Sequence, residues 1–215
     1  MRKRGFVLMA IGAVMVMIAL VFVLANYFEE SRANTNVEQV FDRLFSQIQT
    51  EKSLTKETAT ETNVTYPVDA ATVREILTSP DLEYMEIDGV KYIGYLDIPD
   101  LDLTLPVISE WSYEALKIAP ARYSDPSVSH GLIIAGHSYS KHFGGLSSLE
   151  SGAIIYFTDI CGTIYSFELT EIQTLTPTDV EDMVTGDYDL TLFTCTPGGD
   201  NRVTVRCSFA GSREA

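Results

Sequence analysis

The chain is short of basic residues. Its 215 residues include 15 Lys and Arg against 30 Asp and Glu, and the formal net charge is −15. Proteins that bind nucleic acid neutralise its phosphates with Lys and Arg, so this balance argues against a nucleic-acid partner. Most of the acidic residues are expected to form the solvated surface of one globular domain, since hydrophobic residues make up 46% of the chain.

Cysteine and histidine are also scarce. Three cysteines are too few for a disulfide scaffold in a chain this long, and their odd number leaves at least one thiol free. Two of the three histidines, His137 and His142, combine with a cysteine at no spacing typical of tetrahedral zinc. We therefore expect no metal and no cofactor. A calcium site would need clustered loop carboxylates, and the sequence offers only scattered acids: Asp97, Asp100, Asp102, Glu150 and Asp159.

A long apolar run dominates the N-terminus. Residues 1–4 carry three basic side chains and residues 5–25 carry no charge. This run is long enough to span a bilayer, whereas the apolar core of a secretory signal peptide is only about 7–15 residues long. We expect an uncleaved transmembrane anchor over residues 5–25, with residues 1–4 in the cytoplasm and the remainder outside it. A cleaved signal peptide is the alternative interpretation.

Residues 26–80 are predicted to hold a juxtamembrane helix and a linker. The stretch "TNVEQVFDRLFSQIQ" has apolar residues at helical spacing, and Thr35 with Glu38 fits a capping box. Its apolar face is expected to pack on the domain or to dimerise. The following "TEKSLTKETATETNVTYP" is poor in apolar residues and is interpreted as a solvated linker. A short helix over about 70–77, capped by Asp69, should follow.

Residues 81–215 are predicted to form a mostly β domain. Short β-rich runs alternate with turn signals, and only brief helices are expected, near "SYEALKIA" and "DVEDMV". The runs are "KYIGYLDIP", "LTLPVI", "GLIIAGH", "AIIYFTD", "TIYSFELTEIQTL", "DLTLFTC" and "RVTVRCSFA". This pattern indicates a sandwich or a closed barrel, and it does not fit alternating βαβ units.

The last two runs are typical of an antiparallel hairpin closed by Thr-Pro-Gly-Gly-Asp-Asn. Symmetric closure places Cys195 opposite Arg202, with β-carbons about 4.5–5.5 Å apart. Arg206 then pairs with Thr191, roughly 13 Å further along, and is the weaker candidate. Cys207 falls on the other face and is expected in the apolar core. A slip of one residue would reverse these assignments.

A cation beside Cys195 favours the thiolate, which is the nucleophilic form. A cysteine nucleophile also needs a proton partner, and His137 ends the apolar run "GLIIAGH", where a rigid strand end could support a site. His130 and His142 are interpreted as surface or loop-packing residues. On the residues alone, an ordinary structural role for Cys195 stays open.

Four segments together resemble the sortases, membrane-anchored cysteine transpeptidases of Gram-positive bacteria. "TLFTC" matches the family's Thr-Leu-x-Thr-Cys signature, an arginine follows in "NRVTVR", "IIAGHS" is similar to the region of the catalytic histidine, and "YLDIPDLDLTLPV" is similar to the first two strands. The resemblance covers about residues 90–210. It implies an eight-stranded β-barrel with short helices over residues 81–215, preceded by the transmembrane and juxtamembrane helices. It also implies roles for Cys195 as nucleophile, His137 as acid and base, and Arg202 as stabiliser of substrate and oxyanion.

The resemblance further implies a substrate protein with a C-terminal sorting signal similar to Leu-Pro-x-Thr-Gly. Its acyl group would pass through a Cys195 thioester to an amine of a peptidoglycan precursor or a pilin subunit. The class stays unassigned, because "CTPGGDNR" is similar to pilin sortases while "GHSYSKHFGGL" is closer to housekeeping or haem-uptake types. The alternatives are a non-catalytic anchored binding module and a different thiol peptidase. An L,D-transpeptidase fits poorly, since Thr194 stands where that class places histidine and glycine.

Overall fold

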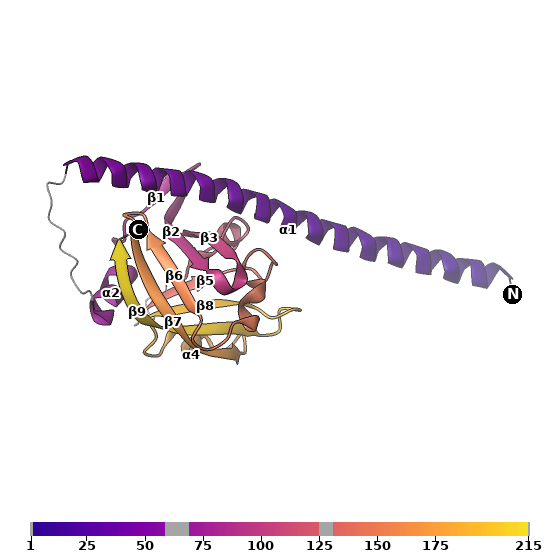
Figure 1. Ribbon diagram of the computed structural model, residues 1–215. Coiled ribbons are helices and arrows are strands. Elements are labelled where there is room, and N and C mark those ends of the chain that lie inside the picture. Colours follow the sequence, from indigo (N-terminus) through magenta and orange to yellow (C-terminus); the bar gives the residue numbers. More distant parts are fainter. Residues whose placement is uncertain (1, 59–68, 125–130, 215) are drawn as a thin grey trace.

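The computed structural model, which describes residues 2–58, 69–124 and 131–214, contains a β-sheet that closes on itself (Figure 1). The strand order is β1-β2-β3-β4-β5-β8-β9-β7-β6, and β2 also pairs with β6. The β2–β6 pairing closes a ring of eight strands, β2 to β9, and β1 pairs only with β2. The expected eight-stranded barrel is therefore confirmed, with β1 as an added edge strand.

Each of the seven predicted runs contains one strand of the barrel. The strands are β1 (Met85–Ile87), β2 (Val90–Ile98), β3 (Leu103–Ile108), β4 (Ala121–Arg122), β5 (Leu132–Ala135), β6 (Ile154–Asp159), β7 (Thr163–Leu175), β8 (Leu190–Cys195) and β9 (Arg202–Glu214). The sequence does not predict β1 and β4, because strands of three and two residues are too short to show alternation.

The helices of the domain are short, as expected; α2 precedes the first strand, and the others connect strands. They are α2 (Ala70–Thr78), η1 (Pro99–Leu101), α3 (Tyr113–Leu116), η2 (Phe143–Ser148) and α4 (Val180–Val184). The side chain of Asp69 caps α2 by accepting a hydrogen bond from Thr72 N at 2.8 Å, as predicted. Val73 and Leu77 of α2 are fully buried, and Arg74 forms an ion pair with Asp189 just before β8. The helix is thereby attached to the barrel.

The β8–β9 hairpin has the predicted register. Cys195 pairs with Arg202, Thr191 pairs with Arg206, and Leu190 pairs with Cys207. Cys207 is completely buried in the apolar core, and this burial raises the pKa of its thiol to about 12. The prediction that Cys207 is a core residue is confirmed.

Closure of the barrel depends on a glycine in β2. Gly94 lies beside a bulge in β2 and pairs with Asp159 of β6. Its φ is 147°, and a β-carbon there would clash with the carbonyl oxygen of Thr158. Only a residue without a side chain lets β2 and β6 approach in this way.

The N-terminal region forms one helix where the sequence predicts separate segments. Helix α1 runs from Arg2 to Thr58, so the linker expected from about residue 50 begins as helix. Residues 59–68 of that linker lie outside the described part of the chain. The chain has no Gly or Pro between Gly12 and Pro67, and its Lys and Glu residues are good helix formers, so nothing local ends the helix earlier.

The transmembrane helix expected over residues 5–25 is not confirmed. Among the residues that the structure describes, no helix is found to be both long enough and apolar enough to cross a membrane.

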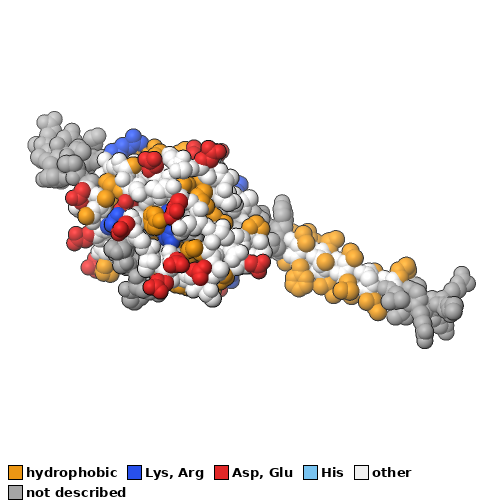
Figure 2. Space-filling model, turned by 90° about the horizontal axis from the view of Figure 1, so that it is seen from below, with side chains coloured by type: hydrophobic (Ala, Val, Ile, Leu, Met, Phe, Trp, Pro, Cys, Tyr) orange, Lys and Arg blue, Asp and Glu red, His pale blue; other side chains and the backbone are white. Residues whose placement is uncertain are grey.

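The later part of α1 packs on the barrel, which is one of the two roles expected for its apolar face. Val37, Leu44 and Ile48 are buried, and the ring of Phe41 lies edge-on to Tyr95 of β2 at a centroid distance of 5.4 Å. In Figure 1, α1 passes along β1, β2 and β3, and its N-terminal half projects well beyond the barrel. Figure 2 shows hydrophobic side chains along that projecting half.

Candidate active site

Two neighbouring parallel strands bring His137 and Cys195 to one edge of the barrel. Strands β5 and β8 pair up to Ala135 and Phe193, and Gly136 N donates to the Phe193 carbonyl at 3.1 Å. His137 and Cys195 each follow two residues later, at the carboxyl ends of strands about 4.8 Å apart. Both side chains are half-buried. The thiol and the imidazole predicted to act together therefore lie on adjacent strand ends.

Arg202 completes this edge from the first residue of β9. Its Nη1 donates to the carbonyls of Gly199 and Asn201 at 3.1 and 3.0 Å. Its Nε and Nη2 donate to nothing within the described ranges, so they are available to an incoming group. Because Cys195 and Arg202 form a register pair, the predicted thiol and guanidinium start from directly opposite backbone positions.

The turn between these two residues is fixed by its own hydrogen bonds. Thr196 N donates to the carbonyl of Asn201 at 2.9 Å, and Asn201 N donates to the hydroxyl of Thr196 at 3.1 Å. Gly198 and Gly199 have φ values of 95° and 84°, which favour glycine. This turn holds the Cys195–Arg202 register.

The segment of residues 136–144, which we call the His137 loop, is closed in the same way. Phe143 N donates to the carbonyl of His137, and His142 N and Gly144 N both donate to the carbonyl of Tyr139, each at 3.0 Å. Phe143 is completely buried and lies where a β-carbon on Gly136 would be. The loop thus presents His137 from a backbone with little freedom.

Ring contacts also support the loop. Tyr139 stacks on His137 with centroids 4.8 Å apart and ring planes inclined by 29°, and it contacts His142 at 5.5 Å. His142 is completely buried, which confirms a loop-packing role. His130 lies outside the described residues. The sequence does not predict the contact between Tyr139 and His137, because a loop has no periodic pattern from which its conformation could be inferred.

Arg206, the weaker candidate, is held apart from this edge. It is 1% exposed, its Nη1 donates to the Met183 carbonyl at 2.9 Å and to Thr191 Oγ1 at 3.1 Å, and its Nη2 donates to the Asp182 carbonyl. Burial lowers the pKa of Arg206. The residue attaches α4 to β8, so its role is structural.

Comparison with known proteins identifies the family. A model of the Sortase domain matches residues 96–210, which is more than half of the chain. The chain belongs to the sortase family. The Cys195–Arg202 hairpin and the His137 loop both fall inside the matched segment.

Two curated sortases are similar in sequence. This chain is 29% identical over 160 residues to Sortase A of Streptococcus agalactiae serotype III (strain NEM316), covering 68% of this chain and 64% of that protein. It is also 29% identical over 118 residues to Sortase A of Staphylococcus aureus (strain NCTC 8325 / PS 47), covering 50% of this chain and 57% of that protein. The chain thus matches less than two thirds of the length of either relative.

Solved sortase structures share the fold. A Clostridium perfringens Sortase D5 transpeptidase aligns with a TM-score of 0.54 at 20% identity, over 84% of this chain and 99% of that chain. Sortase C of Streptococcus pneumoniae also aligns with a TM-score of 0.54 at 20% identity, over 83% and 97%. At these identities the likeness establishes the architecture alone.

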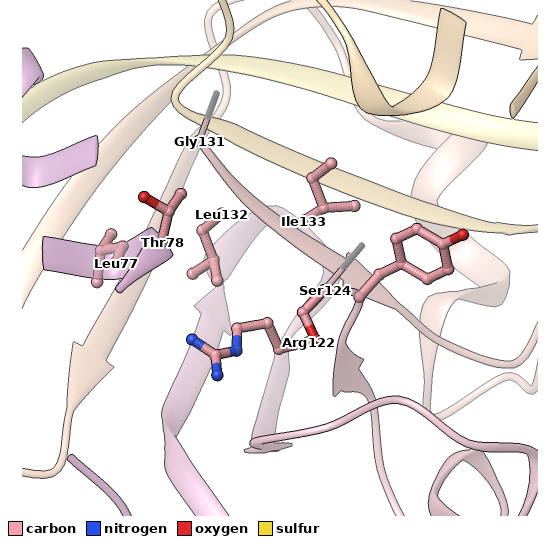
Figure 3. A pocket seen from close by; sticks show the side chains of 8 residues that line it. Leu77, Thr78, Arg122, Ser124, Gly131, Leu132 and Ile133 are labelled. Atoms are coloured by element: carbon pink, nitrogen blue, oxygen red, sulfur yellow. The ribbon is translucent and has the colours of Figure 1, made fainter. Parts of the chain in front are cut away.

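A small cavity lies at the other end of β5 in this sortase (Figure 3). It has a volume of about 70 Å³, and Thr78, Arg122, Gly131 and Leu132 are among the residues that line it. Gly131 precedes His137 by six positions, roughly 20 Å along an extended strand. Arg122 is buried there and donates to the Ser109 and Ser79 carbonyls at 3.0 and 3.1 Å. The cavity is therefore separate from the candidate active site.

The acids considered for calcium do not gather around one point of this sortase. Over the described ranges, no three His, Cys, Asp or Glu side chains are grouped closely enough to hold a metal ion. Asp97 accepts a hydrogen bond from Thr104 at 3.1 Å, and Asp159 accepts from Thr163 N at 2.8 Å and from Tyr165 Oη at 3.0 Å. These two carboxylates therefore form hydrogen bonds within the barrel.

Proposed function

We propose that this sortase is a cysteine transpeptidase. It cleaves a sorting signal similar to Leu-Pro-x-Thr-Gly and joins the new carboxyl end to an amine. The observation that supports this most is the register of the strands. Cys195 of β8 pairs with Arg202 of β9, and β5, the parallel neighbour of β8, ends just before His137. A nucleophile, a proton carrier and a fixed cation at one edge are the parts that acyl transfer requires.

The first half of the reaction forms a thioester. The Cys195 thiolate attacks the Thr carbonyl carbon, and the carbonyl oxygen gains negative charge in the tetrahedral intermediate. Protonated His137 then delivers its proton to the Gly nitrogen as the Thr–Gly bond breaks. The leaving peptide departs as a neutral amine, and the Thr acyl group stays on Sγ of Cys195.

The second half transfers the acyl group. The acceptor amine attacks the thioester carbon, His137 removes a proton from the attacking nitrogen, and Cys195 leaves as thiolate. An amide bond replaces the thioester, and both side chains return to their starting protonation states. Water can compete as the nucleophile, and in that case the enzyme acts as a peptidase.

Arg202 is the proposed stabiliser of the substrate and the oxyanion. Two carbonyls of the turn accept hydrogen bonds from its Nη1, and Nε and Nη2 remain as further donors. A guanidinium with two parallel N–H groups suits a carbonyl oxygen that develops negative charge. Since the cation is already placed, little reorganisation is needed during the reaction.

The donor is proposed to be a secreted protein, and the acceptor an amine of either a peptidoglycan precursor or a pilin subunit. Sortase C of Streptococcus pneumoniae, which shares the fold, has been described in terms of pilin substrate specificity. Both acceptor classes offer a primary amine to the thioester, so the choice between them is left to the experiment.

Intact-mass spectrometry of the full chain tests the reaction. The protein is incubated with a Leu-Pro-x-Thr-Gly peptide library, with and without triglycine or a lysine amine. We expect a mass gain that ends at Thr, and one amine should convert it into an amide product. Cys195→Ala should show no gain, whereas Cys161→Ala, which removes an exposed thiol, is the matched control and should behave as wild type.

Three results would overturn the proposal. One is a folded wild-type protein that forms no adduct with any peptide, as expected of a binding module. Another is an adduct that survives Cys195→Ala. The third is exclusive hydrolysis in the presence of every amine, which would indicate a thiol peptidase.

We also propose that the projecting half of α1 attaches the chain to the membrane, with the barrel outside the cytoplasm. Large apolar side chains are exposed there from Ile11 to Leu24 (Figure 2). Exposed apolar surface of this extent favours a lipid environment. The full chain should sediment with membranes and resist a carbonate wash, and a variant with Leu20, Phe22 and Leu24 changed to Glu should not. Equal amounts of both proteins in the supernatant would contradict this.

A further inference from the structure

We propose that Tyr139 is a positioning residue for the reaction above, whose ring orients the His137 imidazole and stabilises its protonated form. The inference rests on the proposed function, in which protonated His137 delivers a proton to the leaving amine. It adds a residue outside the expected set of Cys195, His137 and Arg202.

The first observation is the geometry of the two rings. Their centroids lie 4.8 Å apart and their planes are inclined by 29°. This distance is inside the range of about 4.5–7 Å over which aromatic rings attract. The nearly parallel arrangement sets the imidazole against the face of the phenol ring, where the π-electrons are concentrated.

The second observation is that Tyr139 has little freedom to move away. Its carbonyl accepts hydrogen bonds from His142 N and Gly144 N, and a β-carbon on Gly144 would lie 2.7 Å from that oxygen. Its ring also contacts His142, which is completely buried. The backbone and a buried neighbour thus fix the surface on which His137 rests.

The chemical consequence concerns the charge on His137. A cation held over an aromatic face is attracted by the ring quadrupole, and planar cations such as guanidinium stack in the same way. An imidazolium is a planar cation, so the stack favours the protonated imidazole over the neutral one. It also limits rotation of the ring, and so narrows the range of directions in which the imidazole can present its N–H.

A simpler role for Tyr139 is packing over His142. The two roles differ in what a substitution changes. If Tyr139 only packs over His142, Tyr139→Leu reduces the bulk at this position and alters the melting temperature. It then leaves the titration of His137 unchanged. Stabilisation of the imidazolium requires an aromatic face, which Tyr139→Phe retains and Tyr139→Leu removes.

Histidine-labelled full chain in detergent provides the test. The three imidazole signals are followed by NMR against pH, and the His137 signal is assigned by its loss in His137→Gln. The variants are Tyr139→Phe, Tyr139→Leu and Tyr84→Leu. Tyr84 is the matched control. It lies next to β1, and its ring faces another cation, with Lys91 Nζ 4.3 Å from the ring centroid. Thioester formation is measured on the same samples from pH 5 to 9.

In Tyr139→Leu we expect the His137 titration midpoint to fall by about half a pH unit or more. The alkaline limb of the rate profile should shift the same way, and kcat/KM at pH 7 should drop about threefold to tenfold. Tyr139→Phe and Tyr84→Leu should stay within about twofold of wild type. If Tyr139→Leu does not fold, Tyr139→Met provides unbranched bulk without a ring.

An unchanged His137 midpoint in folded Tyr139→Leu would overturn the inference, as would an equal loss in Tyr139→Phe. The titration needs no substrate, so it tests the inference about Tyr139 even if the wild-type protein forms no thioester. In that case the proposed function fails by its own assay, and the effect of the stack on His137 is still measured.

Discussion

Cys195 and Arg202 are direct partners across the β8–β9 hairpin, whereas Arg206, four residues further along β9, is buried against α4. The two arginines share one face of the same strand. Their different surroundings separate the role proposed for Arg202 in the reaction from the structural role of Arg206.

Substitution of the two arginines should therefore have opposite signatures. Arg202→Ala should lower the rate of acyl transfer about 100-fold or more, because a preorganised donor to the oxyanion is lost. Its free energy of unfolding should stay close to that of wild type. Arg206→Ala should lower the free energy of unfolding by about 3 kcal/mol or more, since it leaves several buried acceptors unpaired. Peptide-transfer kinetics and urea unfolding of both variants measure the two effects.

The three thiols should react in two groups. Cys161 is exposed and Cys195 is half-buried, whereas burial raises the pKa of Cys207 to about 12. A chromogenic disulfide reagent at pH 8 should therefore modify two thiols of the native chain and a third only in denaturant. Cys161→Ala should leave one reactive thiol and full transfer activity. Rapid modification of Cys207 in the native chain would mean that the core opens at β9.

The buried carboxyl of Asp159 should make stability depend on pH. Burial raises its pKa above the ordinary 3.8, although hydrogen bonds from Thr163 and Tyr165 oppose this. The folded state therefore binds the proton more tightly than the unfolded state, so the contribution of Asp159 to the free energy of unfolding grows as pH falls through the raised value toward 3.8. Asp159→Asn should remove this part of the pH dependence. The variant should gain stability relative to wild type at pH 8, and this gain should shrink toward pH 4.

Urea unfolding of both proteins at several pH values tests this prediction. Asp100→Asn, at an exposed position in η1, is the matched control and should follow the wild-type curve. A difference between wild type and Asp159→Asn that grows toward pH 4 would have the wrong sign.

The contact of α1 with the barrel should depend on one side chain in particular. Leu44 of α1 is completely buried against the barrel, and truncation of a buried leucine to alanine costs about 2–5 kcal/mol. Leu44→Ala should therefore increase hydrogen exchange across residues 37–48, while exchange in β8 and β9 stays slow. Gln47→Ala, on the exposed face, is the control and should exchange as wild type. Unchanged exchange in Leu44→Ala would show that the ring contacts of Phe41 and Phe45 with Tyr95 suffice.

Several of these relationships follow from the sequence. The Cys195–Arg202 register could be predicted because alternation on both strands and a Gly-Gly turn allow only one symmetric closure. The burial of Cys207 followed from that register. The single helix α1 could not be predicted from composition, since a polar Thr-, Glu- and Lys-rich stretch is compatible with both a helix and a solvated linker. The contacts of Arg206 with α4 and of Tyr139 with His137 depend on how loops fold over the barrel.

Helix α1 is continuous from its exposed apolar half to the part that contacts the barrel, and no Gly or Pro interrupts it after Gly12. Glu38 forms an ion pair with Lys141 of the His137 loop at 2.6 Å. Leu24 precedes Glu38 by about 20 Å, at 1.5 Å per residue. On the proposed membrane attachment, the thioester would therefore form at a nearly constant height above the bilayer. Donors and acceptors that are themselves held near that height would meet there without the wide search that a flexible tether requires.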